Sequence, residues 1–179
     1  MTSSHQAPPR RPQRTTSPLD GLVAALDRSV RVRHAGDMNV TDPAECRRRF
    51  ESARRAVLAT TGSDNKPHLV PVTFALLDDD VLVHAVDHKP KRTTALRRLR
   101  TIAENPRVAF LVDQYDDDWA RLWWVRADAE AVVVSDGDRH RRAVAALAAR
   151  YQQYTEIEPA GPVVWATVHG WTGWSAAGA

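Results

Sequence analysis

The chain has 179 residues, of which 43% are hydrophobic and 26% charged, as in an ordinary globular protein. This composition excludes general disorder, and no run of about 18 apolar residues predicts a membrane helix. The single cysteine, Cys46, excludes an internal disulfide framework and a multi-cysteine metal site. We therefore expect a cytoplasmic protein without a membrane partner and without a bound metal.

The net charge of +3 is concentrated at the start of the chain. Residues 1–37 contain six arginines and three aspartates, which leaves 19 basic and 19 acidic side chains in the rest. Because that larger part is neutral, a nucleic-acid partner is not expected. Residues 2–18 have almost no apolar side chains and cannot offset the entropy of ordering. We predict a flexible basic extension over 1–37 and one folded domain over 38–179.

Hydrophobic periodicity and turn residues predict the elements of this domain. A helix is expected after Asp42, a residue suited to the helix cap, and Pro43, which is suited to the first helical turn. Pro71 would interrupt its strand and restricts that position to a sheet edge or a bulge. The predicted order is helix 44–54, strands 56–61, 68–77 and 81–86, helix 94–104, strands 108–112 and 122–134, helix 139–151 and strand 163–174.

Tight turns between consecutive strands indicate antiparallel pairing, because parallel neighbours need long crossovers. About six strands with few helices favour a small closed or half-closed barrel. The fold class is therefore mainly β, of the α+β type, with flanking helices.

The segment from Asp87 to Thr94, with the sequence DHKPKRTT, lies between a predicted strand and a predicted helix. It contains Lys89 and Lys91, two of only three lysines, together with Arg92 and Thr93. Positive side chains at a helix N-terminus oppose the helix dipole, so their presence there favours a bound anion. The alternative is a solvated basic loop paired with carboxylates such as Asp87. Further basic residues on the helix, Arg97, Arg98 and Arg100, are interpreted as surface charges.

Six tryptophans against three phenylalanines indicate large flat surfaces. Trp123 and Trp124 are adjacent in a predicted strand and must face opposite sides, so one can pack inward while the other meets a ligand or partner. Packing in the core or in a dimer remains the alternative for each. His84 and His88 are four residues apart, but on a strand and its exit, which is not the arrangement of a zinc pair.

Other stretches form a pattern with the basic segment. They are Ala59-Thr60-Thr61, Pro67 to Phe74, Asn105 to Val108, Tyr115 to Trp119 (YDDDW), Leu122 to Val125 (LWWV) and Gly170-Trp171. Over 42–175 the chain resembles the pyridoxamine 5'-phosphate oxidase-like superfamily of FMN-binding split barrels. Within that superfamily it resembles the actinobacterial group that depends on coenzyme F420, a deazaflavin.

The resemblance implies a split β-barrel that forms a homodimer with two cofactor sites at the subunit interface. Carried over to this chain, it makes Lys89, Lys91, Arg92 and Thr93 the residues that bind the cofactor phosphate. It places Val70, Pro71, Val72 and Thr73 beside the ring system, with Trp123, Trp124 or Trp171 from the facing subunit or the barrel end. The domain 38–179 would then be the cofactor-binding domain, and no catalytic side chain is identified.

The resemblance implies an oxidoreductase that moves a hydride between coenzyme F420 and a small organic substrate. An FMN-dependent enzyme and a non-catalytic F420 carrier are the alternatives. The stretch Val168-His169-Gly170-Trp171 lacks the basic residues that bind substrate phosphate in true pyridoxamine phosphate oxidases, so vitamin B6 oxidation is not expected.

Overall fold

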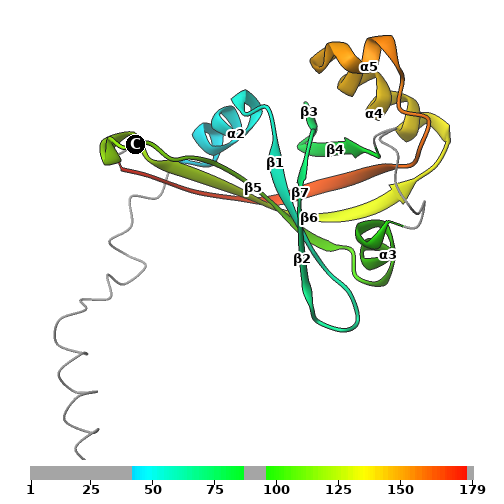
Figure 1. Ribbon diagram of the computed structural model, residues 1–179, viewed down its shortest axis with the longest axis horizontal. Coiled ribbons are helices and arrows are strands. Elements are labelled where there is room, and N and C mark those ends of the chain that lie inside the picture. The colour runs from blue at the N-terminus through cyan, green and yellow to red at the C-terminus, as the bar shows by residue number, and fades with distance from the viewer. Residues whose placement is uncertain (1–41, 87–95, 177–179) are drawn as a thin grey trace, which may run out of the picture. The chain divides into compact units, whose positions relative to one another are not determined.

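The computed structural model describes residues 42–86 and 96–176, and the predicted extension over 1–37 lies outside them. Figure 1 shows the arrangement of the elements. The helices are α2 (Pro43–Ser52), α3 (Arg97–Glu104), α4 (Gly137–Arg150) and α5 (Gln152–Glu156), with a 3-10 turn, η2, at Trp119–Arg121. The strands are β1 (Ala56–Thr61), β2 (Pro67–Val72), β3 (Ala75–Leu77), β4 (Val81–Ala85), β5 (Arg107–Gln114), β6 (Trp123–Val134) and β7 (Val163–Ser175).

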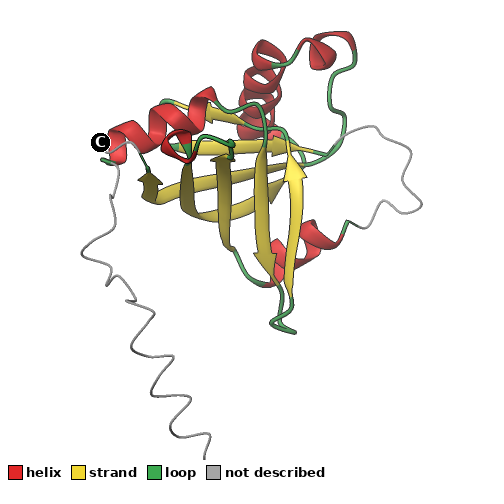
Figure 2. Cartoon of the chain, turned by 60° about the vertical axis from the view of Figure 1, so that its left-hand side comes forward, coloured by secondary structure: helices red, strands yellow, loops and turns green. Residues whose placement is uncertain are grey.

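All seven strands belong to one antiparallel sheet with the order β2-β1-β5-β6-β7-β4-β3. Figure 2 shows that this sheet curls, with helices at its margins. The mainly β, half-barrel architecture predicted from the sequence is thereby confirmed.

The start of α2 follows the predicted chemistry. The Asp42 carboxylate accepts hydrogen bonds from the backbone N–H groups of Ala44, at 3.0 Å, and Glu45, at 3.3 Å. Pro43 occupies the first turn, where its missing N–H costs nothing.

The strand predicted over 68–77 is in fact two strands, β2 and β3. Pro71 does not cause the break, because it pairs with Val57 within β2 and the pairing continues to Val72. It is tolerated there because β2 is an edge strand, as the sequence predicted. The break falls at Thr73 and Phe74 instead.

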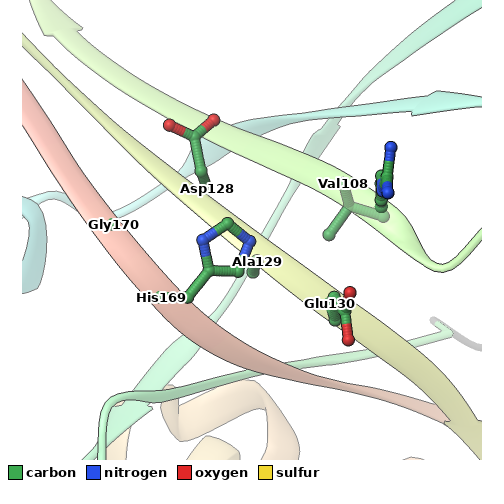
Figure 3. Close-up of a pocket in the computed structure, with 7 residues that line it drawn as sticks. Val108, Asp128, Ala129, Glu130, His169 and Gly170 are labelled. Atoms are coloured by element: carbon green, nitrogen blue, oxygen red, sulfur yellow. The ribbon is translucent and has the colours of Figure 1, made fainter.

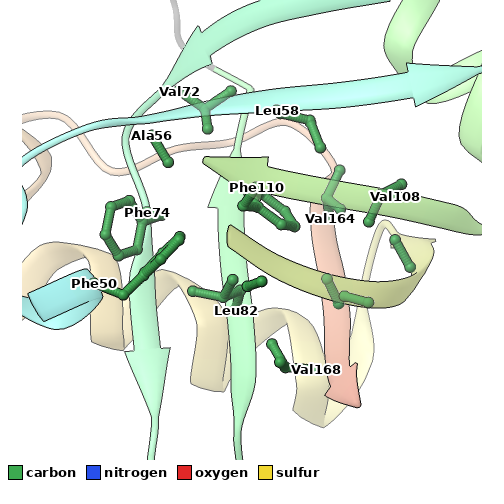
Figure 4. Packing of buried hydrophobic residues seen from close by; sticks show 14 of the residues in the cluster. Phe50, Ala56, Leu58, Val72, Phe74, Leu82, Val108, Phe110, Val164 and Val168 are labelled. Carbon is green, nitrogen blue, oxygen red and sulfur yellow. The ribbon is translucent and has the colours of Figure 1, made fainter. Parts of the chain in front are cut away.

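Two apolar clusters hold the domain together. The first lies inside the curl, where fully buried Phe50 of α2 meets Phe74 edge to face with ring centroids 4.9 Å apart. Figure 4 shows these two rings beside Leu82 and Phe110. The second cluster lies beneath α4 and includes Leu147. The first cluster therefore packs α2 against the sheet, and the second packs α4 against it.

The pairing of β6 with β7 contains a β-bulge. Asp128 pairs with Gly170, but the next residue, Ala129, pairs with Val168. His169 is therefore the extra residue on β7. Bulges redirect side chains and are common next to functional sites.

Candidate functional site

Three basic side chains gather where α3 begins beside β2. His68 belongs to β2, while Arg97 and Arg98 form the first turn of α3. The pKa of His68 is lowered from its ordinary value, first by partial burial and then by the positive charges of Arg97 and Arg98. Arg97 and Arg98 therefore place positive charge at the start of α3, where the Arg97 guanidinium also lies 3.7 Å from the Asp64 carboxylate.

The start of α3 is chemically suited to an anion. Leu96 occupies the cap position, no side chain in the described part of the chain caps it, and no acidic residue lies in the first turn. A helix N-terminus presents N–H groups without intrahelical partners, and its dipole favours negative charge. A phosphate group fits this donor set.

Two contacts fix α3 against the β1–β2 hairpin. The Thr101 hydroxyl donates to the Thr60 hydroxyl at 3.0 Å, and both residues are buried. At the other end, the Glu104 carboxylate accepts from the backbone N–H and the hydroxyl of Ser63, at 3.0 and 3.1 Å, which lowers the pKa of Glu104. A Cβ atom at Gly62 would lie 2.7 Å from the Glu104 carboxylate and 3.1 Å from the Thr101 methyl group, so a larger residue would displace the Glu104 side chain.

The residues predicted to bind phosphate lie next to this site in the sequence. Lys89, Lys91, Arg92 and Thr93 precede Leu96, and all four fall outside the described residues. The sequence analysis also assigned Arg98 to the surface, whereas its side chain is half-buried with a buried Nε.

The residues predicted to lie beside the ring system occupy different faces of β2 and its end. Val70 and Val72 point to the core, and Val72 is 4% exposed. Pro71 is exposed on the opposite face. The Thr73 hydroxyl lies 2.9 Å from the Tyr154 hydroxyl. A cofactor against one face of β2 would therefore meet only some of these four side chains.

The tryptophans divide as their spacing predicted. Trp123 packs against the core, and its indole N–H donates to the Gln114 amide oxygen at 3.0 Å. Trp124 alternates to the other face and pairs in register with Trp174. Trp171 also packs against the core, edge to face with Phe50 at 5.3 Å. Its buried indole N–H has no hydrogen-bond partner among the described residues.

A cavity of about 610 Å³ opens on the sheet at the bulge. Figure 3 shows the His169 imidazole on β7 between the carboxylates of Asp128 and Glu130 on β6. Asp128 is paired with Arg126 at 2.9 Å. Sequence reasoning did not select this cavity, because His169 reaches it only through the shift in strand register. Its lining residues are Arg107, Val108, Asp128, Ala129, Glu130, His169 and Gly170.

No group of three or more His, Cys, Asp or Glu side chains within 42–86 and 96–176 has an arrangement that could hold a metal ion. Over the same residues, no helix is long and apolar enough to cross a membrane.

The profile of the family described as pyridoxamine 5'-phosphate oxidase matches residues 42–175. The chain belongs to this family. The match includes the whole sheet and the start of α3, so both the fold and the electropositive site lie within the family's domain.

The chain is similar to proteins with different described functions. A 5a,11a-dehydrotetracycline/5a,11a-dehydrooxytetracycline reductase of Streptomyces rimosus is 33% identical over 88 residues, which span 48% of this chain and 58% of that protein. A conserved hypothetical protein of Mycobacterium tuberculosis has a similar structure, with a TM-score of 0.61 and 21% identity over 81% of this chain and 91% of the other. A FAD-binding protein of Mesorhizobium loti has a TM-score of 0.58 and 18% identity over 75% and 93%. At these identities the two structures support the fold alone.

Proposed function

We propose that the protein is an oxidoreductase that transfers a hydride between coenzyme F420, bound at a homodimer interface, and a small organic substrate. Membership of the pyridoxamine 5'-phosphate oxidase family supports a redox function. The similarity to a reductase over about half of the chain supports the same class of reaction. The YDDDW and LWWV stretches favour F420 within that class.

The observation that carries the proposal is the electropositive start of α3. Both coenzyme F420 and FMN contain a phosphate, and the positive charges that lower the pKa of His68 would attract it. In this proposal Lys89, Lys91, Arg92 and Thr93 hold the phosphate.

The remaining assigned residues would orient the ring system. The backbone of the edge strand β2, from Val70 to Val72, and the Thr73 hydroxyl would contact one side of it. Trp123, Trp124 or Trp171 would cover the ring from the barrel end or the partner subunit. When bound, the deazaflavin supplies the hydride chemistry, so the chain needs only to bind, orient and exclude water.

Two alternatives remain within the same site. An FMN-dependent oxidoreductase is supported by the flavin named for the Mesorhizobium loti protein of the same fold. A carrier that holds F420 without turnover is consistent with the lack of an identified catalytic side chain.

Titration with F420 and with FMN, followed by absorbance, tests the cofactor. We expect F420 to bind more tightly, and tighter binding of FMN would favour the first alternative. Oxidation of reduced F420 with 5a,11a-dehydrotetracycline as the first probe substrate then tests turnover. Tight F420 binding without turnover of this and other probe substrates would favour the carrier.

A further inference from the structure

The break between β2 and β3 is held by side chains from distant parts of the chain. The Tyr151 hydroxyl accepts from the backbone N–H of Phe74 at 3.1 Å, and its one proton faces the carbonyl oxygens of Phe74 and Arg54, each at 2.9 Å. The imidazole Nδ1 of His84, in β4, lies 3.1 Å from the carbonyl oxygen of Thr73. These contacts hold the carbonyl groups of Thr73 and Phe74 and the N–H group of Phe74 in fixed orientations.

The side chain of Thr73 is held separately. Its hydroxyl forms a hydrogen bond of 2.9 Å with the hydroxyl of Tyr154, in α5, and either group can be the donor. The Tyr154 ring is itself fixed, because it lies edge to face against the buried ring of Tyr151 with centroids 5.8 Å apart. A hydroxyl that makes one hydrogen bond retains the capacity for others, so Thr73 can still contact a ligand.

This arrangement separates two roles. Tyr151 bonds the backbone at the break and is 6% exposed, so it serves the fold. The Tyr154 hydroxyl contacts the Thr73 hydroxyl, a hydrogen bond between two side chains that is not needed to pair any strand. This hydrogen bond holds the Thr73 side chain in one rotamer, and Thr73 is a residue assigned to the cofactor site.

We propose that Tyr154 is a positioning residue of the cofactor site, which fixes the direction in which the Thr73 hydroxyl meets the bound coenzyme. This inference rests on the proposed function. It makes α5, a helix that the sequence analysis did not predict, part of the support of that site.

A double-mutant cycle tests the inference. F420 is titrated into the unchanged chain, Tyr154→Phe, Thr73→Val and the double variant, with thermal unfolding measured for each. We expect each single change to weaken binding by roughly 3- to 10-fold, the effect of one neutral hydrogen bond. The double variant should bind no more weakly than Thr73→Val, because Tyr154 acts through Thr73. Thr73→Ser, which keeps the hydroxyl, should retain most of the affinity.

The matched control is Thr155→Ala, which removes another hydroxyl hydrogen bond of α5, to the Gln152 carbonyl, without touching Thr73. It should leave F420 affinity unchanged. Normal affinity of Tyr154→Phe, or losses that multiply in the double variant, would overturn the inference while leaving the proposed function intact. If the unchanged chain bound neither F420 nor FMN, the proposed function and this inference would both be wrong.

Discussion

The hydroxyl of Thr101 donates to the hydroxyl of Thr60 across 3.0 Å, and both side chains are 2% exposed. This buried contact joins α3 to β1 and so fixes the electropositive start of the helix relative to the sheet. We predict that Thr101→Val lowers the free energy of unfolding by about 1–3 kcal/mol, because it removes a buried hydrogen-bond partner. Denaturant unfolding measures the change.

Thr101→Ser is the control for this prediction, since it keeps the hydroxyl and loses only a methyl group. It should be clearly more stable than Thr101→Val. Equal stability of the two variants would show that the hydroxyl contact does not hold α3.

The lowered pKa of His68 predicts how its site responds to pH. A folded-state pKa below the ordinary 6.5 means that the folded chain disfavours the protonated imidazole. The stability contributed by this group is therefore complete above pH 6.5 and is lost as the pH falls through 6.5 toward the folded-state pKa. An NMR titration of the His68 ring, assigned by its disappearance in His68→Gln, should give a midpoint below 6.5.

Removing a positive charge near His68 should move that midpoint, whereas removing a distant one should not. Arg97→Ala should raise the pKa of His68, because it removes one of the positive charges that lower it. Arg126→Ala, which removes the partner of Asp128 in β6, should leave it unchanged. No rise of the midpoint in Arg97→Ala would contradict the electropositive site, because burial alone would then account for the lowered pKa of His68.

Local patterns were sufficient for most of the strands. The run Ala56–Thr61, closed by the turn residues 62–65, predicted β1 with its observed bounds. The Asp42 and Pro43 pair similarly predicted the start of α2. The bounds of β1 and the start of α2 depend on residues that are close in the sequence, so local sequence patterns are enough to predict them.

Features that depend on distant contacts were missed. The backbone at Thr73 and Phe74 is held by Tyr151 and His84, which belong to other parts of the chain. The cavity at His169 exists because of a register shift between β6 and β7, which single-strand patterns do not contain. The basic segment Asp87–Thr94 stays a prediction, because residues 87–95 fall outside the described part of the chain.

An apolar area on the outer face of the sheet supports the expected homodimer. Leu69 and Leu111 are 61% and 37% exposed. They share one face, since Leu69 pairs with Ala59 and Ala59 pairs with Ala109, two residues before Leu111. Exposed apolar surface of this kind commonly marks an interface. We predict that the combined change Leu69→Glu and Leu111→Glu produces a monomer in light scattering.

Ile157→Glu is the matched control for the dimer, because Ile157 is 63% exposed and follows α5 rather than lying on this face. It should remain dimeric. A stable monomer of the unchanged chain at micromolar concentration would exclude a cofactor site built from two subunits.

Gly173 is predicted to be required for the packing of α2 on β7. A Cβ atom there would lie 2.7 Å from the Cys46 sulfur and 3.1 Å from the Trp124 carbonyl oxygen. Gly173→Ala should therefore destabilise the chain by about 1–3 kcal/mol, the usual cost of overpacking a core. In the same strand, Gly170→Ala meets nothing closer than 3.9 Å and serves as the control in thermal unfolding. Equal melting temperatures would contradict the close approach.

The lysines of the basic segment give the most direct test of phosphate binding. If Lys89 and Lys91 hold the cofactor phosphate, alanine at either position removes a charge-assisted contact of about 1.5–3 kcal/mol. F420 affinity should then fall about 10- to 150-fold. Folding should survive, since both lysines precede Arg97, the first residue of α3, in the sequence. Arginine at either position should be milder than alanine, because it keeps the charge but changes the geometry of its donors.

Lys66→Ala is the control: Lys66 is the remaining lysine of the chain, exposed beside the β1–β2 turn. If Lys89→Ala and Lys91→Ala bound F420 with the same dissociation constant as the unchanged chain, the segment would be an ordinary basic loop. The phosphate would then have to bind near His68 and Arg98 instead.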